Sequence, residues 1–296
     1  MNVFVTGGSG FVGKAVIQAL LERDHHVHAP VNHRPLQIND DRVKSFPGGL
    51  FDAAAVDTAM RDCQAVIHLV GIIREKPSAG ITFDRIHHQG TARIVEAARR
   101  AGIGRYVQMS AIGASPDSPS EYHRTKFAAE ECVRASGLDW TIFRPSMILG
   151  PGGEFSGMEE RWARGSAAPY LFMPYFGAGF LGLGPKFRIQ PVLVSDVARA
   201  FVDAIDKPAA IGQVYPLAGP QEMTWPQMHQ AIARKITGHS KPVLPIPAWY
   251  AKLMSWIVPS FLLPFTADQV RMSQQDNVAD MTEFAKTFGW SPGPAI

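Results

Sequence analysis

Tyr122 and Lys126 are the pair in this chain whose residue types and spacing best suit acid–base chemistry. Four positions make about one helical turn, so both side chains share one face of the helix expected over residues 121–136. A lysine ammonium one turn from a phenol lowers the pKa of the phenol and can hydrogen-bond a sugar hydroxyl. The phenol can then pass a proton to or from a carbonyl or an alcohol. Because this spacing arises by chance in roughly one such chain in five, ligand contact by Lys126 and catalysis by Tyr122 are separate predictions.

A glycine-rich turn near the start of the chain is suited to holding a diphosphate. The apolar run Asn2–Thr6 is followed by Gly7, Gly10 and Gly13, and by the apolar spacing of a helix over residues 11–23. A strand that turns directly into a helix presents free backbone N–H groups at the positive end of the helix dipole. We expect Gly7 to allow the turn, Gly10 the approach of the ligand and Gly13 the packing of the helix. The alternative is a turn without a ligand.

These residues need a scaffold, and strand and helix patterns alternate through the first half of the chain. Alternation predicts an α/β fold, a doubly wound Rossmann sheet of parallel strands with helices on both faces. Ligands of such sheets collect beyond the carboxyl ends of the strands. Strands are expected at residues 2–6, 26–31, 43–46, 65–70, 105–110 and 139–144, and helices at 11–23, 52–61, 84–101 and 121–136.

The pattern changes after residue 150. Residues 151–186 are rich in glycine, proline and aromatic residues, which indicates long loops around a short helix. A strand and a helix follow over residues 188–205. We therefore predict a Rossmann domain over residues 1–150 and a smaller mixed lobe over 151–296, within which residues 187–220 return to the Rossmann core.

Composition and charge exclude several classes of protein. The 296 residues are 46% hydrophobic and 19% charged, which is typical of a globular chain. The formal net charge is +3 and the basic residues are scattered, so nucleic acid is not expected as a partner. Cys63 and Cys132 form no CxxC motif and the paired histidines lack metal-ligand spacing, so we expect no metal and the reduced thiols of a cytoplasmic protein. No signal peptide is expected, because the first strand begins at the first residues.

No stretch of the sequence is long and apolar enough to span a bilayer, and residues 243–265 come nearest. That stretch contains Lys252 and is interrupted by Pro245, Pro247, Pro259 and Pro264. Two interpretations stay open. The segment is a lid or a core helix of the second lobe, or it lies on a membrane surface through Trp249, Tyr250, Trp256 and Phe261.

Several segments together resemble the short-chain dehydrogenase/reductase superfamily in its extended or atypical branch. They are TGGSGFVG at 6–13, VIHLVGI at 66–72, HHQGT at 87–91, YVQMSAIGA at 106–114, YHRTK at 122–126, FRPSMILGPG at 143–152 and FRIQPVLVSDVARA at 187–200. The GxxGxxG spacing of the first suits this superfamily better than GxGxxG does. Within it, the chain is most similar to the NADPH-binding accessory subunit of mitochondrial complex I and its bacterial relatives. That likeness rests on VGI at 70–72, SAIGASPDSPSEYHRTK at 110–126 and TADQVRMSQQDNV at 266–278.

The resemblance implies a domain that binds NAD(P), with the smaller lobe over the nicotinamide end. By position, the residues implied around the diphosphate are Gly7, Ser9, Gly10, Phe11 and Val12. Leu50 is implied beside the adenine, and Val70 and Gly71 along the riboses. The implied catalytic set at the nicotinamide ribose is Ser110, Tyr122 and Lys126, and the implied nicotinamide pocket is Pro145, Ser146, Met147 and Ile148.

Three positions depart from the family pattern. Active members have Ser or Thr two places after Ser110 to hydrogen-bond the reacting oxygen, whereas this chain has Ile112, which leaves Ser110 as the substitute. Gly49 stands where an acidic residue usually precedes the adenine-flanking position, and Asn32 stands where a basic residue usually follows the second strand.

The end of the second strand also bears on the choice between NAD and NADP. No acidic residue lies between Val27 and Leu36 to hold ribose hydroxyls, and Arg34, with His33 beside it, can pair with a 2′-phosphate. A solvated loop arginine is an equally supported alternative. With Asn32 and Arg34 counted in the cofactor site, the sequence favours NADP slightly over NAD.

Two functions from different classes follow. The first is an NAD(P)-dependent oxidoreductase or epimerase acting on an apolar small molecule, with Tyr122 as acid/base. Its pocket is expected from Leu171, Phe172, Phe176, Phe180 and Leu181, although ordinary core packing explains the same run. The second is a non-catalytic NADPH-binding accessory or assembly protein of a complex I type, either cytoplasmic or peripheral on the inner face of the membrane. Ile112 and the subgroup likeness motivate it.

Overall fold

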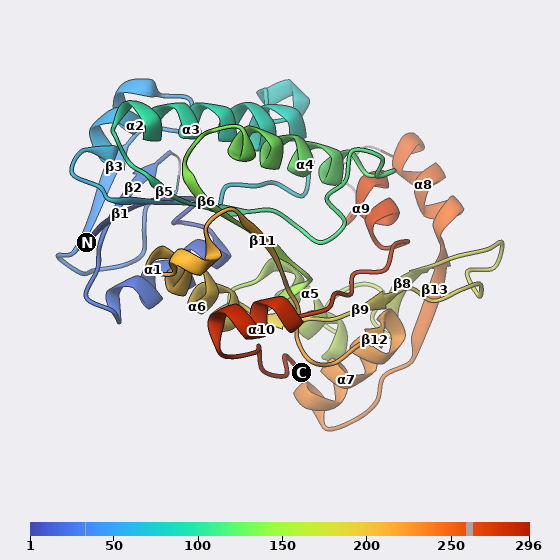
Figure 1. The fold of residues 1–296 in the computed structure, drawn as a ribbon. Helices are drawn as coiled ribbons and strands as arrows, with labels where there is room; N and C mark the ends of the chain where they lie inside the picture. Colours follow the sequence, from blue (N-terminus) through green and yellow to red (C-terminus); the bar gives the residue numbers. More distant parts are fainter. Residues whose placement is uncertain (33, 259–262) are drawn as a thin grey trace.

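A parallel sheet of seven strands forms the centre of the molecule in the computed structural model, which describes residues 1–32, 34–258 and 263–296 (Figure 1). Its strand order is β11-β6-β5-β4-β1-β2-β3, and each neighbouring pair is parallel. The predicted α/β Rossmann sheet is therefore confirmed. The strands are β1 (Asn2–Thr6), β2 (His26–Val31), β3 (Val43–Pro47), β4 (Ala65–His68), β5 (Arg105–Met109), β6 (Asp139–Pro145) and β11 (Gln213–Leu217).

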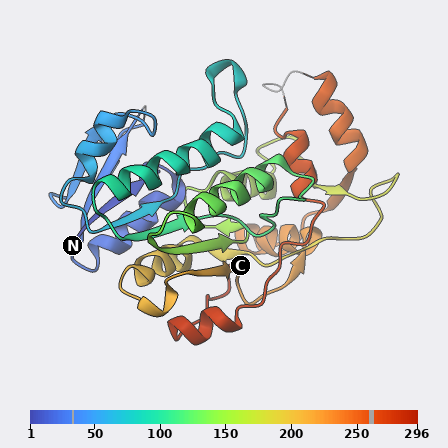
Figure 2. The same cartoon turned by 45° about the horizontal axis from the view of Figure 1, so that its top comes forward.

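Helices cover both faces of this sheet, which is why its central strands are continuously apolar. One face carries α1 (Phe11–Leu21), α6 (Val194–Ile205) and α10 (Thr282–Phe288), and the other carries α2 (Ala53–Met60), α3 (Gly90–Arg100) and α4 (Glu121–Arg134) (Figures 1 and 2). Val16 and Phe201 belong to the hydrophobic cluster under the first set, and Ile94 and Val133 to the cluster under the second. The strand ends that face the candidate site are thus fixed from both sides.

The predicted helix over residues 84–101 differs in its first part. Residues Asp84–Gln89 form a π-helix, and α3 continues from Gly90 without a break. The wider turn brings His87 inward, where the side chain is almost completely buried. A π-turn inside a helix is often found at a functional site.

The remaining elements form smaller layers beside the sheet. Helices α5 (Glu154–Ala163) and α7 (Trp225–Thr237) contact each other, and the buried Glu159 carboxylate lies 2.8 Å from Nδ1 of His229 between them. Three pairs of short strands surround them: β7 (Ile148–Leu149) with β10 (Val192–Leu193), β9 (Arg188–Ile189) with β12 (Met223–Thr224), and β8 (Met173–Gly177) with β13 (Val243–Pro247). The remaining helices are α8 (Ala248–Ile257) and α9 (Ala267–Met272). The 3-10 turns are Pro77–Ala79 and Pro208–Ala210.

Helix α8 resolves part of the question left open for residues 243–265. It buries Ala248 and Ala251 in a small cluster with Val270 of α9, whereas Trp249 and Trp256 are exposed. The segment is therefore a surface helix rather than a core helix, as far as its described residues go. Pro259 and Phe261 lie outside the described residues. Among the helices of the described ranges, none has the length and hydrophobicity that a membrane crossing requires.

A buried carboxylate ties α4 to the sheet. Glu130, fully buried on α4, accepts hydrogen bonds from Nε and Nη2 of Arg144 on β6 at 2.8 and 2.7 Å. Arg134 adds a third bond at 2.9 Å. A carboxylate without water must be matched by such donors, so this cluster fixes the height of α4 above β6.

We expect Glu130→Gln to lower the free energy of unfolding by about 2–4 kcal/mol, because it leaves two arginines without their buried counter-charge. Chemical denaturation followed by circular dichroism measures this. The control is Glu131→Gln, whose exposed pair with Arg134 should change stability by less than about 1 kcal/mol. Equal losses of stability in the two variants would contradict the role of the buried Glu130 carboxylate in fixing α4 to β6.

Candidate functional site

The turn between β1 and α1 has the conformation that its glycines predict. Gly7 has a φ of +73°, in the left-handed region that favours glycine. The N–H of Gly10 donates to the carbonyl oxygen of Gly7 at 2.9 Å and closes the turn. A Cβ atom at position 13 would lie 2.1 Å from that same carbonyl oxygen. Helix α1 can therefore approach the turn this closely only with Gly13.

The start of α1 fits an anionic group. Its N-cap is Gly10, which has no side chain to cap the first N–H groups, and the first turn contains no acidic residue. Free N–H groups at a helix N-terminus bind phosphate oxygens. The ring of Phe11 lies against the loop after β7, since a Cβ at Gly153 would lie 3.0 Å from it. The backbone of this turn therefore fits the diphosphate of a dinucleotide.

Lys126 lies at the carboxyl edge of the sheet, one strand away from that turn. Its ammonium group is buried and donates to the carbonyl oxygen of Met109 at 3.2 Å. Burial lowers the pKa of Lys126 to about 8, although the nearby Glu130 carboxylate acts in the opposite direction. A Cβ at Gly71 would lie 3.0 Å from Nζ, so a side chain at position 71 would crowd the ammonium group.

Tyr122 lies one turn before Lys126 but differs from the expectation in its pKa. Its ring contacts His87 and Phe83 edge-on, with centroids 5.2 and 5.9 Å apart. Burial, together with a smaller contribution from the Asp268 carboxylate, raises the pKa of Tyr122 to about 12. The expected lowering by Lys126 is therefore wrong: Nζ lies 6.0 Å from the ring centroid, and desolvation outweighs its charge. At neutral pH the phenol holds its proton.

His87 joins the loop after β4 to α4. Its Nε2 lies 3.0 Å from the backbone nitrogen and 3.1 Å from the carbonyl oxygen of Ile72, and its Nδ1 lies 2.9 Å from Oγ1 of Thr125. Burial and the Lys126 charge hold the pKa of His87 well below its usual value, so the ring is neutral at neutral pH. The ring therefore acts as a rigid wall behind Tyr122.

Several buried polar atoms near Lys126 lack partners within the described residues. They include Oγ of Ser110, Nε2 of His68 and Oε1 of Gln108. Ser110 follows directly after Met109, whose carbonyl Lys126 contacts, and its hydroxyl is almost completely buried. A buried hydroxyl without a partner costs free energy unless a ligand or a water supplies one. The Ser110 hydroxyl therefore fits a donor to a bound sugar or to a reacting oxygen.

Asp268 of α9 holds the start of α4 in place, and sequence reasoning did not find it. Its carboxylate accepts from Oγ of Ser120 at 2.7 Å and from the N–H groups of Glu121 and Tyr122 at 3.0 and 3.2 Å. A carboxylate is favourable at a helix N-terminus. The predicted segment 266–278 contains the residue, but only the tertiary contact shows its target.

At the adenine end the predicted residues lie together. The amide of Asn32 lies against Gly49, where a Cβ would be 3.3 Å from Asn32 Cγ. Leu50 packs over Gly90 of α3, since a Cβ there would lie 2.4 Å from Leu50 Cδ2. Arg34 is exposed, with no hydrogen bond or ion pair to any other described residue.

The residues predicted to line the nicotinamide pocket follow β6. Pro145 ends this strand and leads into Ser146, Met147 and Ile148. Ser146 is buried and its hydroxyl donates to the carbonyl oxygen of Asn277 at 3.2 Å, so it is held by the closing segment of the chain. The side-chain Oδ1 of Asn277 is buried without a partner within the described residues. Asn277 is a second residue of segment 266–278 that the sequence analysis did not single out.

The apolar run expected to line a substrate pocket does not do so. Leu171, Phe180 and Leu181 are among the most exposed apolar residues of the molecule. Phe172 and Phe176 are half-buried, and the ring centroid of Phe176 lies 5.0 Å from that of Phe265. Pairing of β8 with β13 directs the segment after Gly177 away from the sheet, which places it at the surface.

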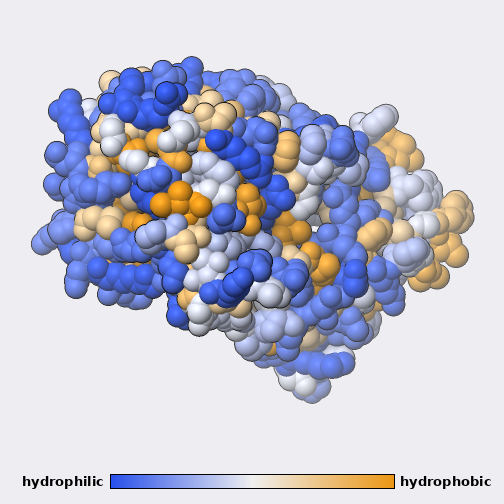
Figure 3. Space-filling model, viewed as in Figure 1, coloured by the Kyte–Doolittle hydropathy of each residue, from blue (hydrophilic) through white to orange (hydrophobic). Residues whose placement is uncertain are grey.

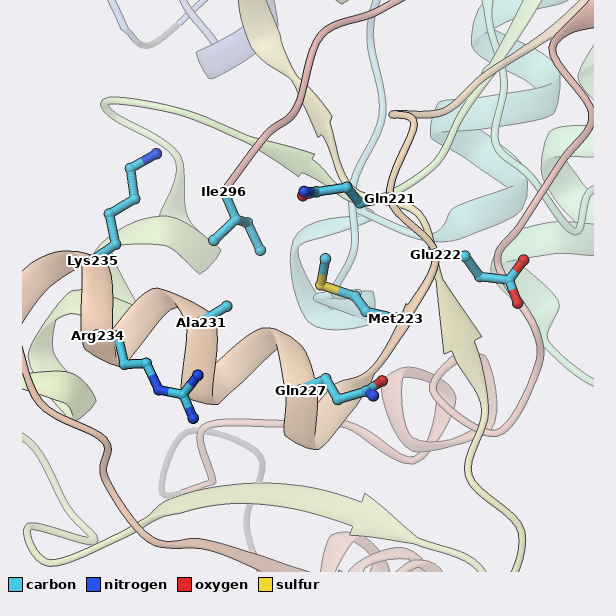
Figure 4. Close-up of a pocket in the computed structure, with 8 residues that line it drawn as sticks. All are labelled: Gln221, Glu222, Met223, Gln227, Ala231, Arg234, Lys235 and Ile296. Atoms are coloured by element: carbon cyan, nitrogen blue, oxygen red, sulfur yellow. The ribbon is translucent and has the colours of Figure 1, made fainter.

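A separate hollow of about 570 Å³ lies along α7 and the closing residues, bordered by Met223, Gln227, Arg234 and Ile296 (Figure 4). None of its lining residues belongs to the predicted cofactor site. It is open, and nothing in it points to a ligand. Within the described ranges, no three His, Cys, Asp or Glu side chains are grouped to hold a metal ion.

Comparison with known sequences gives both a family and homologues. The model of the family described as "NAD(P)H-binding" matches residues 7–157, just over half of the chain. A similar relative is the mitochondrial NADH dehydrogenase (ubiquinone) 1 alpha subcomplex subunit 9 of Arabidopsis thaliana, 29% identical over 92% of this chain and 68% of the relative. Another is a ceramide reductase of Caulobacter vibrioides, 32% identical over 57% of this chain and 53% of the relative.

A comparison of structures gives the same fold. The UDP-glucose 4-epimerase of Thermotoga maritima, solved with UDP-glucose, has a TM-score of 0.73 at 21% identity and covers 99% of this chain and 94% of its own. At this identity the likeness concerns the fold alone. The matched span begins at Gly7 and includes the β1–α1 turn and Lys126, and the chain therefore belongs to the NAD(P)H-binding family.

Proposed function

We propose that the protein is an NAD(P)-dependent oxidoreductase that reduces an apolar small molecule. The observation that carries this is the placement of Tyr122 and Lys126 on one face of α4, beside the unpartnered Ser110 hydroxyl at the carboxyl edge of the sheet. A fold that only binds nucleotide has no need of a protonated phenol there. The residues proposed to hold the cofactor are Gly7, Ser9, Gly10, Phe11, Val12, Asn32, Arg34, Leu50, Val70, Gly71, Ser110, Lys126, Pro145, Ser146, Met147 and Ile148.

The dinucleotide, when bound, would supply the hydride. The chain would supply the contact to the ribose, a hydrogen bond to the reacting oxygen and the proton. The Lys126 ammonium would hydrogen-bond the ribose hydroxyls, because it lies against the backbone of Gly71 at the carboxyl edge of the sheet. Ser110 donates a hydrogen bond to the reacting oxygen, the role for which Ile112 is unsuited. Tyr122 donates the proton to that oxygen. A phenol whose pKa is raised to about 12 holds its proton at neutral pH, which favours reduction over oxidation.

The substrate class rests on the walls of the site. Phe83 and the neutral His87 ring pack around Tyr122, and Ile112 stands where a hydroxyl is usual, so the surroundings of the phenol favour an apolar substrate. A sugar nucleotide needs basic groups for its diphosphate. The relative named as a ceramide reductase supports an apolar substrate.

A second candidate is a non-catalytic NADPH-binding accessory or assembly protein of a respiratory complex, located in the cytoplasm or at the inner face of a membrane. Its supports are Ile112 and the relatives named as subunits of NADH dehydrogenase. In that role the nucleotide stabilises the fold by binding only the native state.

The two candidates make opposite predictions for Tyr122→Phe. If the phenol is the proton donor, NADPH oxidation with a panel of apolar ketones and quinones should fall at least about a hundredfold while NADPH binding is kept. The matched control is the exposed Tyr250→Phe, which should retain full turnover. Bound nucleotide with no turnover by the unaltered protein would favour the accessory role and reject the enzyme.

The affinity for NADPH should depend on pH through Lys126. The ammonium is charged below its pKa of about 8, so binding weakens as the pH rises through that value, by at most about tenfold per pH unit. Fluorescence titration of NADPH at a series of pH values measures this. Lys126→Met should remove the inflection, whereas Lys286→Met on exposed α10 should keep it. An inflection that survives Lys126→Met would contradict the role.

Arg34 is proposed to select NADP through its 2′-phosphate. Arg34→Ala should weaken NADPH binding by about 1–3 kcal/mol and leave NADH binding unchanged, because only NADPH carries that phosphate. Calorimetric titration with each nucleotide distinguishes the two. Arg61→Ala, another exposed arginine, is the control. Equal losses for both nucleotides would mean that Arg34 does not read the phosphate.

A further inference from the structure

One end of the molecule exposes an unusual group of large apolar side chains. Six of them, between 48% and 80% exposed, define what we term the apolar end: Phe180, Leu181, Leu183, Trp249, Trp256 and Ile257. Figure 3 shows hydrophobic residues gathered there, over α8 and the loop after β8. Single exposed apolar residues are common, but a contiguous group usually marks a surface that another body covers.

Contacts between the loop and α8 make these side chains one surface. The ring of Phe180 stacks on that of Trp249 at 5.8 Å, and Nε1 of Trp249 donates to the carbonyl oxygen of Phe180 at 2.9 Å. Along α8, Trp249, Leu253 and Trp256 recur at the spacing of one helical face, while Ala248 and Ala251 face inward. The exposed tryptophans therefore lie on a regular helix, and Trp249 is held in its outward position by a hydrogen bond.

Charge is segregated in the same region. Residues 161–195 and 223–267, which contain both parts of the apolar end, hold eight Lys and Arg and no Asp or Glu. The rest of the chain has 26 acidic and 21 basic residues and is net negative. Arg164 and Arg188 pair with acidic neighbours, but Lys186 and Lys252 flank the apolar end without an ion pair to any described residue.

We propose that the apolar end docks on the surface of an anionic lipid bilayer. Tryptophan beside aliphatic side chains, with lysines at the border and no acidic group, suits the interface between acyl chains and anionic headgroups. A second copy of this chain would instead set like charges against each other, because its apolar end carries the same lysines. The inference depends on neither candidate function of the nucleotide site.

The docked end is close to the candidate site. Helix α8 packs on α9, and Asp268 of α9 caps the helix that carries Tyr122. Docking through α8 therefore places a bilayer one helix away from Tyr122 and Lys126. An apolar compound dissolved in the lipid would then be close to these two residues.

Vesicle co-sedimentation of the full chain tests the proposal, with phosphatidylcholine vesicles that contain or lack phosphatidylglycerol. We expect binding that requires phosphatidylglycerol, weakens in high salt, and shifts tryptophan emission to the blue. The triple variant Leu181→Ser, Trp256→Ser, Ile257→Ser should bind at least about tenfold more weakly. Ile211→Ser, an exposed residue on another face, should bind as the unaltered protein does.

Lys186→Glu with Lys252→Glu tests the electrostatic part, and Lys286→Glu on α10 is its control. Unchanged NADPH binding shows that each variant is folded. Failure to bind phosphatidylglycerol vesicles, or equal binding by the triple variant, would overturn the proposal. So would a dimer that dissociates in the triple variant, because the apolar end would then be an interface between copies.

Discussion

The carbonyl oxygen of Gly7 occupies the place that any side chain at position 13 would need, and the rest of the nucleotide site depends on that contact. Backbone packed on backbone brings the first turn of α1 to the end of β1, where its free N–H groups face the same edge as Lys126. A larger residue at position 13 would move the helix and separate the diphosphate site from the acid–base pair.

The second constraint is the burial of a charged amine, that of Lys126, away from water. Lys126 is almost fully buried, and the groups around it adapt to that charge: Met109 accepts from it, Glu130 lies one turn further on, and His68 and His87 stay neutral. Desolvation lowers the pKa of the amine to about 8. Nearby, the Ser110 hydroxyl and other buried polar atoms have no hydrogen-bond partner among the described residues. Such strain is common where a ligand completes the set.

The closing third of the chain acts on the site from a distance. Asp268 caps α4 and Asn277 accepts a hydrogen bond from Ser146, so one late segment of the chain holds both the start of α4 and the residue that follows β6. The same segment supports α8 and its outward tryptophans. Orientation of the acid–base helix and exposure of the apolar end are therefore consequences of one packing arrangement.

The sequence by itself determined the α/β sheet, the glycine turn and the shared helical face of Tyr122 and Lys126, because periodicity and glycine spacing are local properties. It did not determine the pKa of Tyr122, which depends on burial and on a carboxylate that arrives from α9. Nor did it place Phe180 and its neighbours, since an apolar run looks the same whether it lines a pocket or projects into solvent. Tertiary structure decided these points because desolvation and long-range capping depend on what packs against a residue, and that information is absent from local spacing.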